Sequence, residues 1–175
     1  MPPSSVAANA SKGMYGAGTP WLEGGGVAQR LGLAVRRERG AWEVAAGVEL
    51  GRGDVRAQDL TIQQLETLAY ADLRWRVPLG VALPYVGARA GGGWVHQTFE
   101  RDQERMVQAV FGQSAIPGRD GAVGLALLTA GAEIPFAARL FARLEAFGGA
   151  VVPHLAAGWT ARPYAGGRAA VGWRW

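Results

Sequence analysis

The chain has 175 residues, which fits one domain, and its 18 Lys and Arg exceed its 14 Asp and Glu for a formal net charge of +4. With 49% hydrophobic and only 18% charged residues, it is too apolar for a disordered protein. The lack of cysteine excludes a disulfide framework, a thiolate zinc site and cysteine catalysis, and the scattered basic residues form no nucleic-acid interface.

The first ten residues, 1–10, are predicted to be a flexible segment, followed by a single domain over residues 11–175. Residues 1–11 carry no positive charge and no sustained apolar core, so they do not form a signal peptide. No stretch reaches the roughly 18 apolar residues of a transmembrane helix, which excludes a helical membrane protein. A membrane barrel is still possible, because its strands need only about 9–11 residues each.

Alternation of apolar with small or charged residues, the period of a β-strand, dominates the rest of the chain. The weakest candidate comes first, at residues 11–17, and is needed for the even strand number of outer-membrane barrels. Seven clearer strands follow at residues 27–37, 41–52, 65–77, 81–95, 122–134, 140–148 and 169–175. The pattern therefore predicts an all-β protein with eight strands.

The two faces of these strands differ in composition. One face is apolar, as at Trp42, Val44 and Val48, while the other combines Gly and Ala with Arg and Glu, unlike the wet face of a soluble sheet. Small residues between long charged ones suit a crowded barrel interior in which opposite charges pair. The predicted lumen network is nearly balanced, with the cations Arg30, Arg36, Arg74, Arg76, Arg89, Arg143 and Arg174 and the anions Glu43, Glu49, Glu66, Asp72, Glu133 and Glu145.

Connections of two lengths alternate between the predicted strands. Short turns are expected at residues 37–40, 78–80 and 135–138, and longer loops at residues 18–24, 52–64, 96–120 and 149–167. Outer-membrane barrels combine short periplasmic turns with long outer loops in this order.

Tryptophans on the apolar face indicate interfacial girdles. Trp42, Trp75, Trp173 and Trp175 lie close to the short-turn or C-terminal ends of their strands, and Trp94 lies at a long-loop end. Aromatic side chains at such heights are typical of the two membrane–water interfaces.

These residues resemble the eight-stranded outer-membrane barrels of the outer membrane protein A type. Residues 84–91 (PYVGARAG) look like that superfamily's "PYVGAGxG" strand, residues 130–134 (AGAEI) like its "GAGVEY" strand, and residues 140–145 (LFARLE) like its "LSLRAEY" strand. The ending, with Val171, Trp173 and Trp175, is similar to the "GxRYRF" signal that the barrel-insertion machinery recognises, although Trp175 replaces the usual Phe. The resemblance covers residues 11–175.

The resemblance implies an antiparallel up-and-down transmembrane β-barrel in the outer membrane of a Gram-negative bacterium. Both termini would lie in the periplasm and the long loops outside the cell. Its partners would be outer-membrane lipid and lipopolysaccharide, the barrel-insertion machinery during assembly, and an extracellular ligand at the loops. We expect a monomer without a cofactor or a metal, and no nucleic-acid partner.

One segment raises the possibility of an enzyme. Lipid A deacylases of this barrel shape use a His, a Ser two residues further on, and a Glu; here His96 is followed by Thr98, with Glu100 nearby. Thr is a poor replacement for Ser as a nucleophile. His154, the other histidine, is expected in an outer loop in contact with water.

Two loop features suggest binding rather than catalysis. Arg52, Gly53 and Asp54 form the tripeptide that can bind adhesion receptors, though Gly-Asp also starts ordinary turns. Residues 99–111 could form a short amphipathic helix in the longest loop. Arg101, Arg105 and Arg119 there are candidates for lipopolysaccharide phosphates, and equally for plain solvation.

The favoured function is a structural or surface-interaction role for a barrel whose lumen is plugged by charges, with no catalytic residue assigned. The alternatives are a narrow passive channel for small solutes, a lipid A-modifying enzyme at His96 and Thr98, and a soluble ligand carrier with its apolar face inward. No P-loop, dinucleotide fingerprint or metal-ligand cluster is present in the sequence.

Overall fold

The computed structural model describes residues 12–175 except 24–25, 58–59, 78, 100–118, 156–157 and 160, so the predicted N-terminal segment 1–10 lies outside the described residues. Its strands are β1 (Lys12–Glu23), β2 (Gly26–Arg39), β3 (Trp42–Ala57), β4 (Leu60–Arg76), β5 (Leu83–Phe99), β6 (Arg119–Pro135), β7 (Leu140–Leu155), β8 (Gly158–Trp159) and β9 (Arg162–Arg174). No helix long and apolar enough to cross a membrane occurs within these described ranges.

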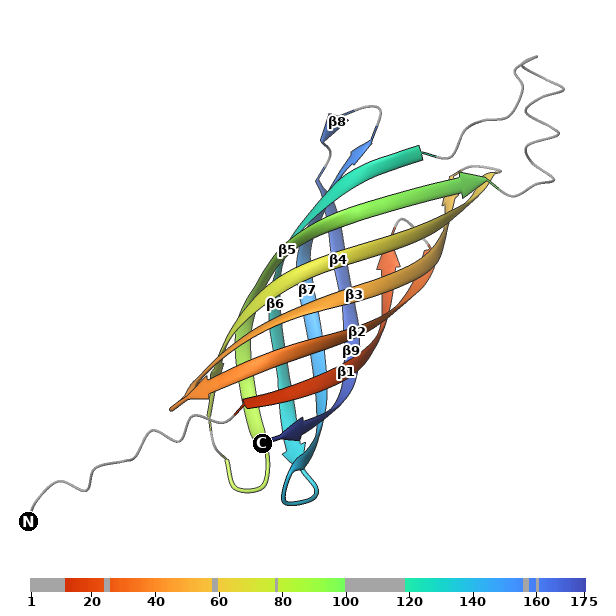
Figure 1. The fold of residues 1–175 in the computed structure, drawn as a ribbon. Coiled ribbons are helices and arrows are strands. Elements are labelled where there is room, and N and C mark those ends of the chain that lie inside the picture. Colours follow the sequence, from red (N-terminus) through yellow and green to blue (C-terminus); the bar gives the residue numbers. More distant parts are fainter. Residues whose placement is uncertain are drawn as a thin grey trace, which may run out of the picture.

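Eight long strands close into a barrel (Figure 1). Each strand from β1 to β7 pairs antiparallel with the next along the chain. The last long strand, β9, pairs antiparallel with both β7 and β1, which completes the ring. The two-residue strand β8 pairs with the last two residues of β7, His154 and Leu155. This confirms the predicted fold class, an eight-stranded antiparallel up-and-down β-barrel.

The connections after β2, β4 and β6 share one end of the barrel with the C-terminus and the start of β1, which we call the short-turn end (Figure 1). The connections after β1, β3, β5 and β7 share the other end, which we call the long-connection end because it holds the longest one, residues 100–118. The connections after β1 and β3 are only two residues long, so the predicted long loops at 18–24 and 52–64 are wrong. The turn from β2 to β3 is equally short and consists of Gly40 and Ala41. Gly40 has a φ of 59°, and no atom would lie within 4 Å of an added Cβ, so its backbone conformation and not its space calls for glycine.

The strands run further toward the long-connection end than the sequence pattern predicted. Pairing of β3 with β4 continues to Ala57 and Leu60, so most of the predicted loop 52–64 is strand. Likewise β1 reaches Glu23, β7 reaches Leu155 and β9 begins at Arg162, where loops 18–24 and 149–167 were expected. In a membrane-embedded barrel the hydrophobic alternation would end with the lipid, whereas the backbone hydrogen bonds of the ladder could continue into water.

The length of the strands agrees with this explanation. The 17 residues of β4 rise roughly 40 Å along the membrane normal, at about 3.3 Å per residue and a tilt of about 45°. The hydrocarbon core is only about 30 Å thick. Several residues of such a strand would therefore extend beyond the hydrocarbon core of a membrane.

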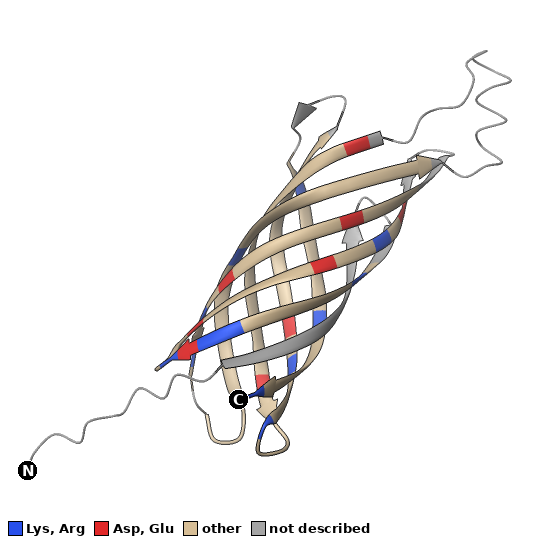
Figure 2. Cartoon of the chain, viewed as in Figure 1, with Lys and Arg blue, Asp and Glu red and all other residues tan. Residues whose placement is uncertain are grey.

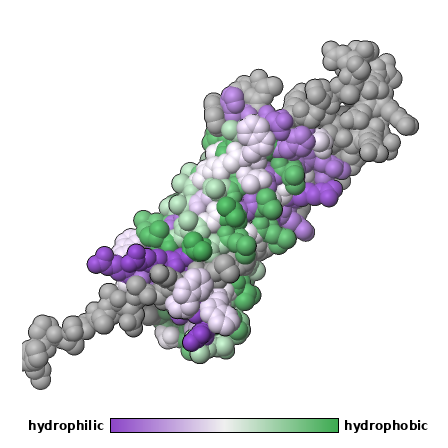
Figure 3. All heavy atoms as spheres, in the orientation of Figure 1, coloured by the Kyte–Doolittle hydropathy of each residue, from purple (hydrophilic) through white to green (hydrophobic). Residues whose placement is uncertain are grey.

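Side chains alternate strictly between the exterior and the lumen. The outward positions are exposed and mostly apolar, including Leu33, Val48, Leu73, Val86 and Leu144. Figure 3 shows hydrophobic residues in green over the middle of the visible face of the barrel. The inward positions of the same strands are buried and carry most of the charge. This arrangement is the inverse of a soluble barrel, so the soluble-carrier alternative is wrong: its apolar face would have to point inward.

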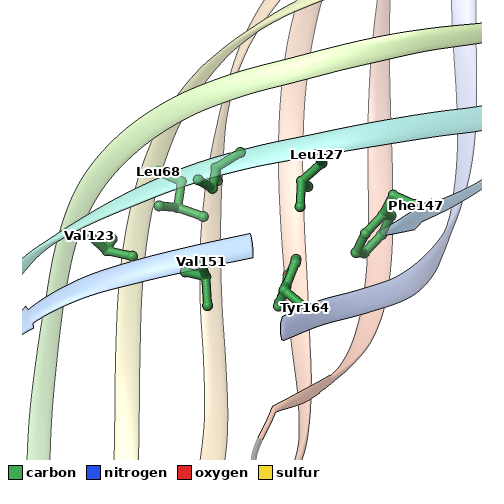
Figure 4. Packing of buried hydrophobic residues seen from close by; sticks show 7 residues of the cluster. Leu68, Val123, Leu127, Phe147, Val151 and Tyr164 are labelled. Atoms are coloured by element: carbon green, nitrogen blue, oxygen red, sulfur yellow. The ribbon is translucent and has the colours of Figure 1, made fainter. Parts of the chain in front are cut away.

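The lumen also contains an apolar cluster that the sequence analysis did not predict. Leu68, Val123, Leu125, Leu127, Phe147, Val151 and Tyr164 are all buried, and Figure 4 shows six of them pointing into the space between β4, β6, β7 and β9. Both faces of residues 122–128 are apolar, so hydrophobicity alone could not say which face pointed inward. The interior is therefore part charged and part hydrocarbon.

Candidate functional site

The strand register places opposite charges side by side in the lumen. Glu43 lies opposite Arg74, and Asp72 lies opposite Arg89 on the following pair of strands. Acidic and basic positions lie on several strands of the barrel wall in Figure 2. Directly opposite residues of unlike charge are the pairs that stabilise a sheet most readily, and here burial removes the competing water.

Glu43 and Glu133 form the centre of the network near the short turns. Both side chains are fully buried, at 0% exposure. Arg74 Nη1 lies 2.5 Å from Glu43 Oε1, and Arg143 Nη2 lies 2.8 Å from Glu43 Oε2 and 2.6 Å from Glu133 Oε2. Arg36 pairs with both carboxylates, 3.1 Å from Glu43. Each carboxylate is thus surrounded by several guanidinium groups.

A second group, around Asp72 and Glu145, continues the network toward the middle of the barrel. Arg89 donates from Nε to Asp72 Oδ1 at 2.7 Å and from Nη2 to Glu145 Oε1 at 2.8 Å. Tyr85 donates its hydroxyl to Glu145 at 2.9 Å. Arg74 connects the two groups, because its Nη2 lies 2.6 Å from Asp72 while its Nη1 contacts Glu43.

Further ion pairs lie closer to the long-connection end. Arg30 pairs with Glu66 and lies 3.8 Å from Glu49, which also pairs with Arg168. Above them, Gln97 Nε2 donates to Gln64 Oε1 at 2.9 Å, and Gln64 donates to Glu66. The polar chain therefore continues almost to the outer mouth.

The thirteen predicted lumen residues are buried with ion-pair partners, except that Arg174, paired with Glu133, keeps 27% of its side chain exposed. Two members were missed. Glu38 pairs with Arg76 at 2.8 Å and with Arg36 at 3.2 Å, and Arg168 pairs with Glu49. Glu38 has the same parity as Arg36, which could have identified it, whereas Arg168 fell just outside the predicted last strand.

Glycines in the wall make room for the large side chains of the lumen. A Cβ at Gly47 would lie 2.6 Å from the Tyr70 hydroxyl, and a Cβ at Gly131 would lie 2.7 Å from the Tyr85 hydroxyl. Aromatic rings also cover the guanidinium groups, since Arg36 lies 3.8 Å from the centre of the Phe141 ring. The small residues of the polar face are therefore a packing requirement of the network.

The apolar cluster fills much of the remaining outer half. The rings of Phe147 and Tyr164 stack with centroids 5.4 Å apart, and Arg30 lies 5.2 Å from the Tyr164 ring centre. Near the outer mouth a pocket of about 10 Å³ remains beside Gln64, Val95 and Val151, enough for about one water molecule.

The predicted girdle tryptophans all lie on the exterior, and each is roughly half-exposed. Trp42 and Trp75 are direct cross-strand neighbours at the short-turn end, and Trp173 lies opposite Leu140 at the same end. Trp94 lies toward the other end. Val171, Trp173 and Trp175, the predicted insertion signal, point outward along the end of β9. Their roles in the interface and in assembly stay predictions.

The rim at the outer end of β5 and β6 brings together a polar group that the sequence analysis only partly identified. His96 lies opposite Asp120, and its Nδ1 is 2.7 Å from Asp120 Oδ1. Trp94 Nε1 donates to the same oxygen at 3.2 Å. The hydrogen bond from His96 and, to a smaller extent, the one from Trp94 lower the pKa of the Asp120 carboxyl below its ordinary value.

Asp120 takes the place expected for Glu100, which lies outside the described residues. Thr98 is two residues beyond His96 on the same outward face of β5, and is partly exposed. Hydroxyl, imidazole and carboxylate thus occupy the outer rim on the lipid side. Sequence reasoning missed Asp120 because the register across residues 100–118 could not be predicted from the pattern.

Two predicted loop motifs are placed differently by the structure. Arg52, Gly53 and Asp54 belong to β3 and pair with β4, so this tripeptide is an extended strand and not a surface loop. His154 belongs to β7, opposite Ala122, and not to a loop. The amphipathic segment 99–111 lies almost wholly outside the described residues, as do Arg101 and Arg105. Arg119 begins β6, so it is not a loop residue.

Within the described ranges, no group of three or more His, Cys, Asp or Glu side chains is arranged to hold a metal ion. The carboxylates of the lumen are instead occupied by arginines. The chemistry available in the lumen is therefore ion pairing and exclusion of water.

Comparison with known proteins supports the fold. No protein-family model matches the chain, and no curated protein matches its sequence. Among solved structures, it is similar to the N-terminal β-barrel domain of OprF from Pseudomonas aeruginosa, with a TM-score of 0.55 and 17% identity over 94% of this chain and 97% of that one. It is also similar to Ail, the attachment invasion locus protein of Yersinia pestis, with a TM-score of 0.55 and 15% identity over 95% and 98% of the two chains.

A third similar structure is the Neisserial surface protein A, with a TM-score of 0.52 and 10% identity over 94% of this chain and 95% of that one. At these identities the likeness shows a shared architecture. The chain has the fold of the eight-stranded outer-membrane β-barrels.

Proposed function

We propose that this barrel resides in the outer membrane of a Gram-negative bacterium and has a structural and surface-interaction role, with a lumen closed to solutes. The observation that supports this proposal is that ion pairs and apolar side chains fill the interior of the barrel. Fully buried Glu43 and Glu133 are each held by several arginines, and an apolar cluster occupies the outer half above them. A hydrated ion would have to break several buried ion pairs to pass.

The outward-facing surface fits the same proposal. Its apolar band is bounded by Trp42, Trp75 and Trp173 at one end and by Trp94 near the other. With the short turns and the C-terminus in the periplasm, the longer hairpins extend beyond the outer leaflet. Those hairpins would carry any recognition of lipopolysaccharide or of an extracellular ligand.

Single-channel recording in a planar bilayer tests the closed lumen. The sample is detergent-refolded protein whose mobility shift on an unheated gel shows a folded barrel. We expect no discrete conductance steps over many insertions. Regular steps from the unaltered protein would overturn the proposal in favour of the narrow channel, and Arg89→Ala would then change the step size.

The His96–Asp120 contact supports a second candidate, hydrolysis of an acyl ester of a lipid at the outer rim. Asp120 on Nδ1 would orient the imidazole, leaving Nε2 to take the proton of the Thr98 hydroxyl as that oxygen attacks the ester carbonyl. The lipid alcohol would leave as it takes that proton from His96, and water would then hydrolyse the acyl-enzyme to the free fatty acid and restore the Thr98 hydroxyl. The position of the three groups on the lipid side of the rim suits a lipid substrate such as lipid A.

Release of fatty acid from lipid A in mixed micelles tests this candidate. If it is right, His96→Ala and Asp120→Asn lower the rate by roughly 10²–10⁴-fold, while Thr98→Ser keeps or raises it. His154→Ala is the matched control, because it removes the chain's other histidine, whose cross-strand partner is Ala122 and not His96 or Asp120. A rate that survives His96→Ala and Thr98→Ala would reject it.

A further inference from the structure

The lipid-facing surface has two unlike sides. Over β2 to β4 it carries bulky aliphatic residues such as Leu33, Val48 and Leu50. Over β5 to β7 it carries mostly small ones, including Ala88, Ala126, Ala130 and Gly148. Where the two sides meet, the exterior is hollowed. We call this hollow the exterior groove, and it is lined by Trp42, Leu73, Trp75, Ala88, Leu128 and Gly148.

Two hollows of about 660 and 620 Å³ make up the exterior groove. They share Leu73, Ala88, Leu128 and Gly148, so they are continuous. Trp42 and Trp75 border the first hollow. The lining is overwhelmingly apolar, which suits a hydrocarbon chain.

The register shows how the exterior groove runs. Trp42 pairs with Trp75, which pairs with Val86 on β5, and the same row continues through Ala130 to Ala146 on β7. Trp42 is the first residue of β3, whereas Ala146 is six residues beyond the first residue of β7. The row therefore rises from the periplasmic edge toward the middle of the barrel.

Positive charge lies at the low end of the exterior groove. Arg39 is the cross-strand partner of Trp42, and Arg37 is the partner of Val44, which borders the second hollow. Both arginines are exposed on the outer face, while Glu38 between them points inward to Arg76. Figure 3 shows this hydrophilic patch at the lower end of β2.

Among the side chains that the structure describes at this end, the exposed charged ones, Arg37, Arg39 and Arg139, are all cationic. The exposed carboxylates that are described, Asp54 and Asp120, lie at the opposite end. A second copy inserted in the same direction could not bring those carboxylates to these arginines. The charge therefore favours a lipid over a second copy of the chain.

We propose that the exterior groove binds an anionic phospholipid of the periplasmic leaflet. Arg37 and Arg39 hold its phosphate by charge-assisted hydrogen bonds, and one acyl chain lies along the groove past Trp42, Leu73 and Leu128. Because Arg39 is the cross-strand neighbour of Trp42, a lipid whose phosphate contacts the two arginines has the beginning of its acyl chain next to Trp42. The site is separate from the lumen and from the outer rim.

Native mass spectrometry of the refolded barrel with phosphatidylglycerol or phosphatidylcholine of identical chains tests this proposal. We expect phosphatidylglycerol to be retained about tenfold more tightly. The double variant Arg37→Gln/Arg39→Gln should remove that preference. Arg52→Gln is the matched control, since Arg52 is an exposed arginine at the opposite end of the neighbouring strand β3, and it should keep the preference.

A groove-filling variant separates the acyl-chain contact from headgroup attraction. A Cβ at Gly148 would meet nothing within 4 Å, so Gly148→Leu fills the exterior groove without disturbing the barrel. It should lower retention of both lipids by about tenfold, with the gel mobility shift of a folded barrel unchanged. Equal retention of the two lipids, retention that Gly148→Leu leaves intact, or a lipid-independent dimer would each overturn the proposal.

Discussion

The two halves of the lumen are filled by different means. The half nearer the short turns, which is the periplasmic half in the proposed orientation, is closed by ion pairs around Glu43, Glu133 and Arg143, with few atoms exposed to solvent. The outer half combines the Arg30 and Glu49 pairs with a hydrocarbon cluster centred on Leu127 and Phe147. The first half depends on each charge keeping its partner, whereas the second depends on packed volume. The two halves should therefore fail differently when altered.

The largest effect is expected where a buried charge loses its partner. Glu43→Gln leaves Arg36, Arg74 and Arg143 facing a neutral amide in a site with no exposure. We expect a loss of about 3–5 kcal/mol in the free energy of unfolding, measured by urea titration in micelles. Glu43→Gln with stability within about 1 kcal/mol of the unaltered barrel would show that the pairs around it are not essential.

Removing hydrocarbon from the outer half should cost somewhat less. Leu127→Ala leaves a cavity beside Phe147 and should lower the free energy of unfolding by about 2–4 kcal/mol. Leu128→Ala on the next, lipid-facing position removes the same atoms without leaving a buried void, and is the matched control. If the two variants are destabilised equally, the apolar cluster contributes nothing beyond its contact with lipid.

A smaller effect should follow from crowding the wall of the periplasmic half. Gly131→Ala places a Cβ too close to the backbone carbonyl oxygen of Leu144 and 2.7 Å from the Tyr85 hydroxyl, which donates to Glu145, so the backbone and that hydrogen bond must both shift. We expect a loss of about 1–3 kcal/mol. Gly148→Ala, whose Cβ meets no neighbour, should leave the unfolding midpoint unchanged.

The smallest effect should occur at the rim, outside both halves. Because the folded-state pKa of Asp120 is lowered, its contact with His96 stabilises the barrel above the ordinary carboxyl pKa of about 3.9 and is lost as the pH falls through the lower folded value. The stability difference between the unaltered protein and Asp120→Asn should therefore vanish in strong acid. A difference that grew as the pH fell would contradict this assignment.

The two halves of the lumen also differ in how well their side-chain directions could be predicted from the sequence. Charged residues of the periplasmic half alternate with apolar ones, so the parity of Glu43, Arg74 and Arg143 predicted which way they point. In β6 both parities are apolar, so Val123 and Leu125 were not recognised as interior residues, although extending the parity of Thr129 and Glu133 backward would have identified them.

Contacts between strands were less predictable than the faces of strands. The His96–Asp120 pair depends on the register across a long connection, and a shift by one residue would have turned the two side chains to opposite faces. The outer extensions of β3, β4 and β7 lack the hydrophobic alternation that lipid imposes, so nothing in their composition distinguished strand from loop.

The seam between β1 and β9 closes the ring, with pairs from Gly13 opposite Arg174 to Gly18 opposite Ala169 and again at Trp21 and Leu22. In a closed ladder every long strand is paired on both sides, so the position of the chain ends does not determine whether the ring closes. Joining the two ends and reopening the chain between β3 and β4 should give a permuted protein that still closes in micelles. Its Trp175 would then lie inside the chain, so the permuted protein separates the closing of the ring from the predicted insertion signal at the C-terminus.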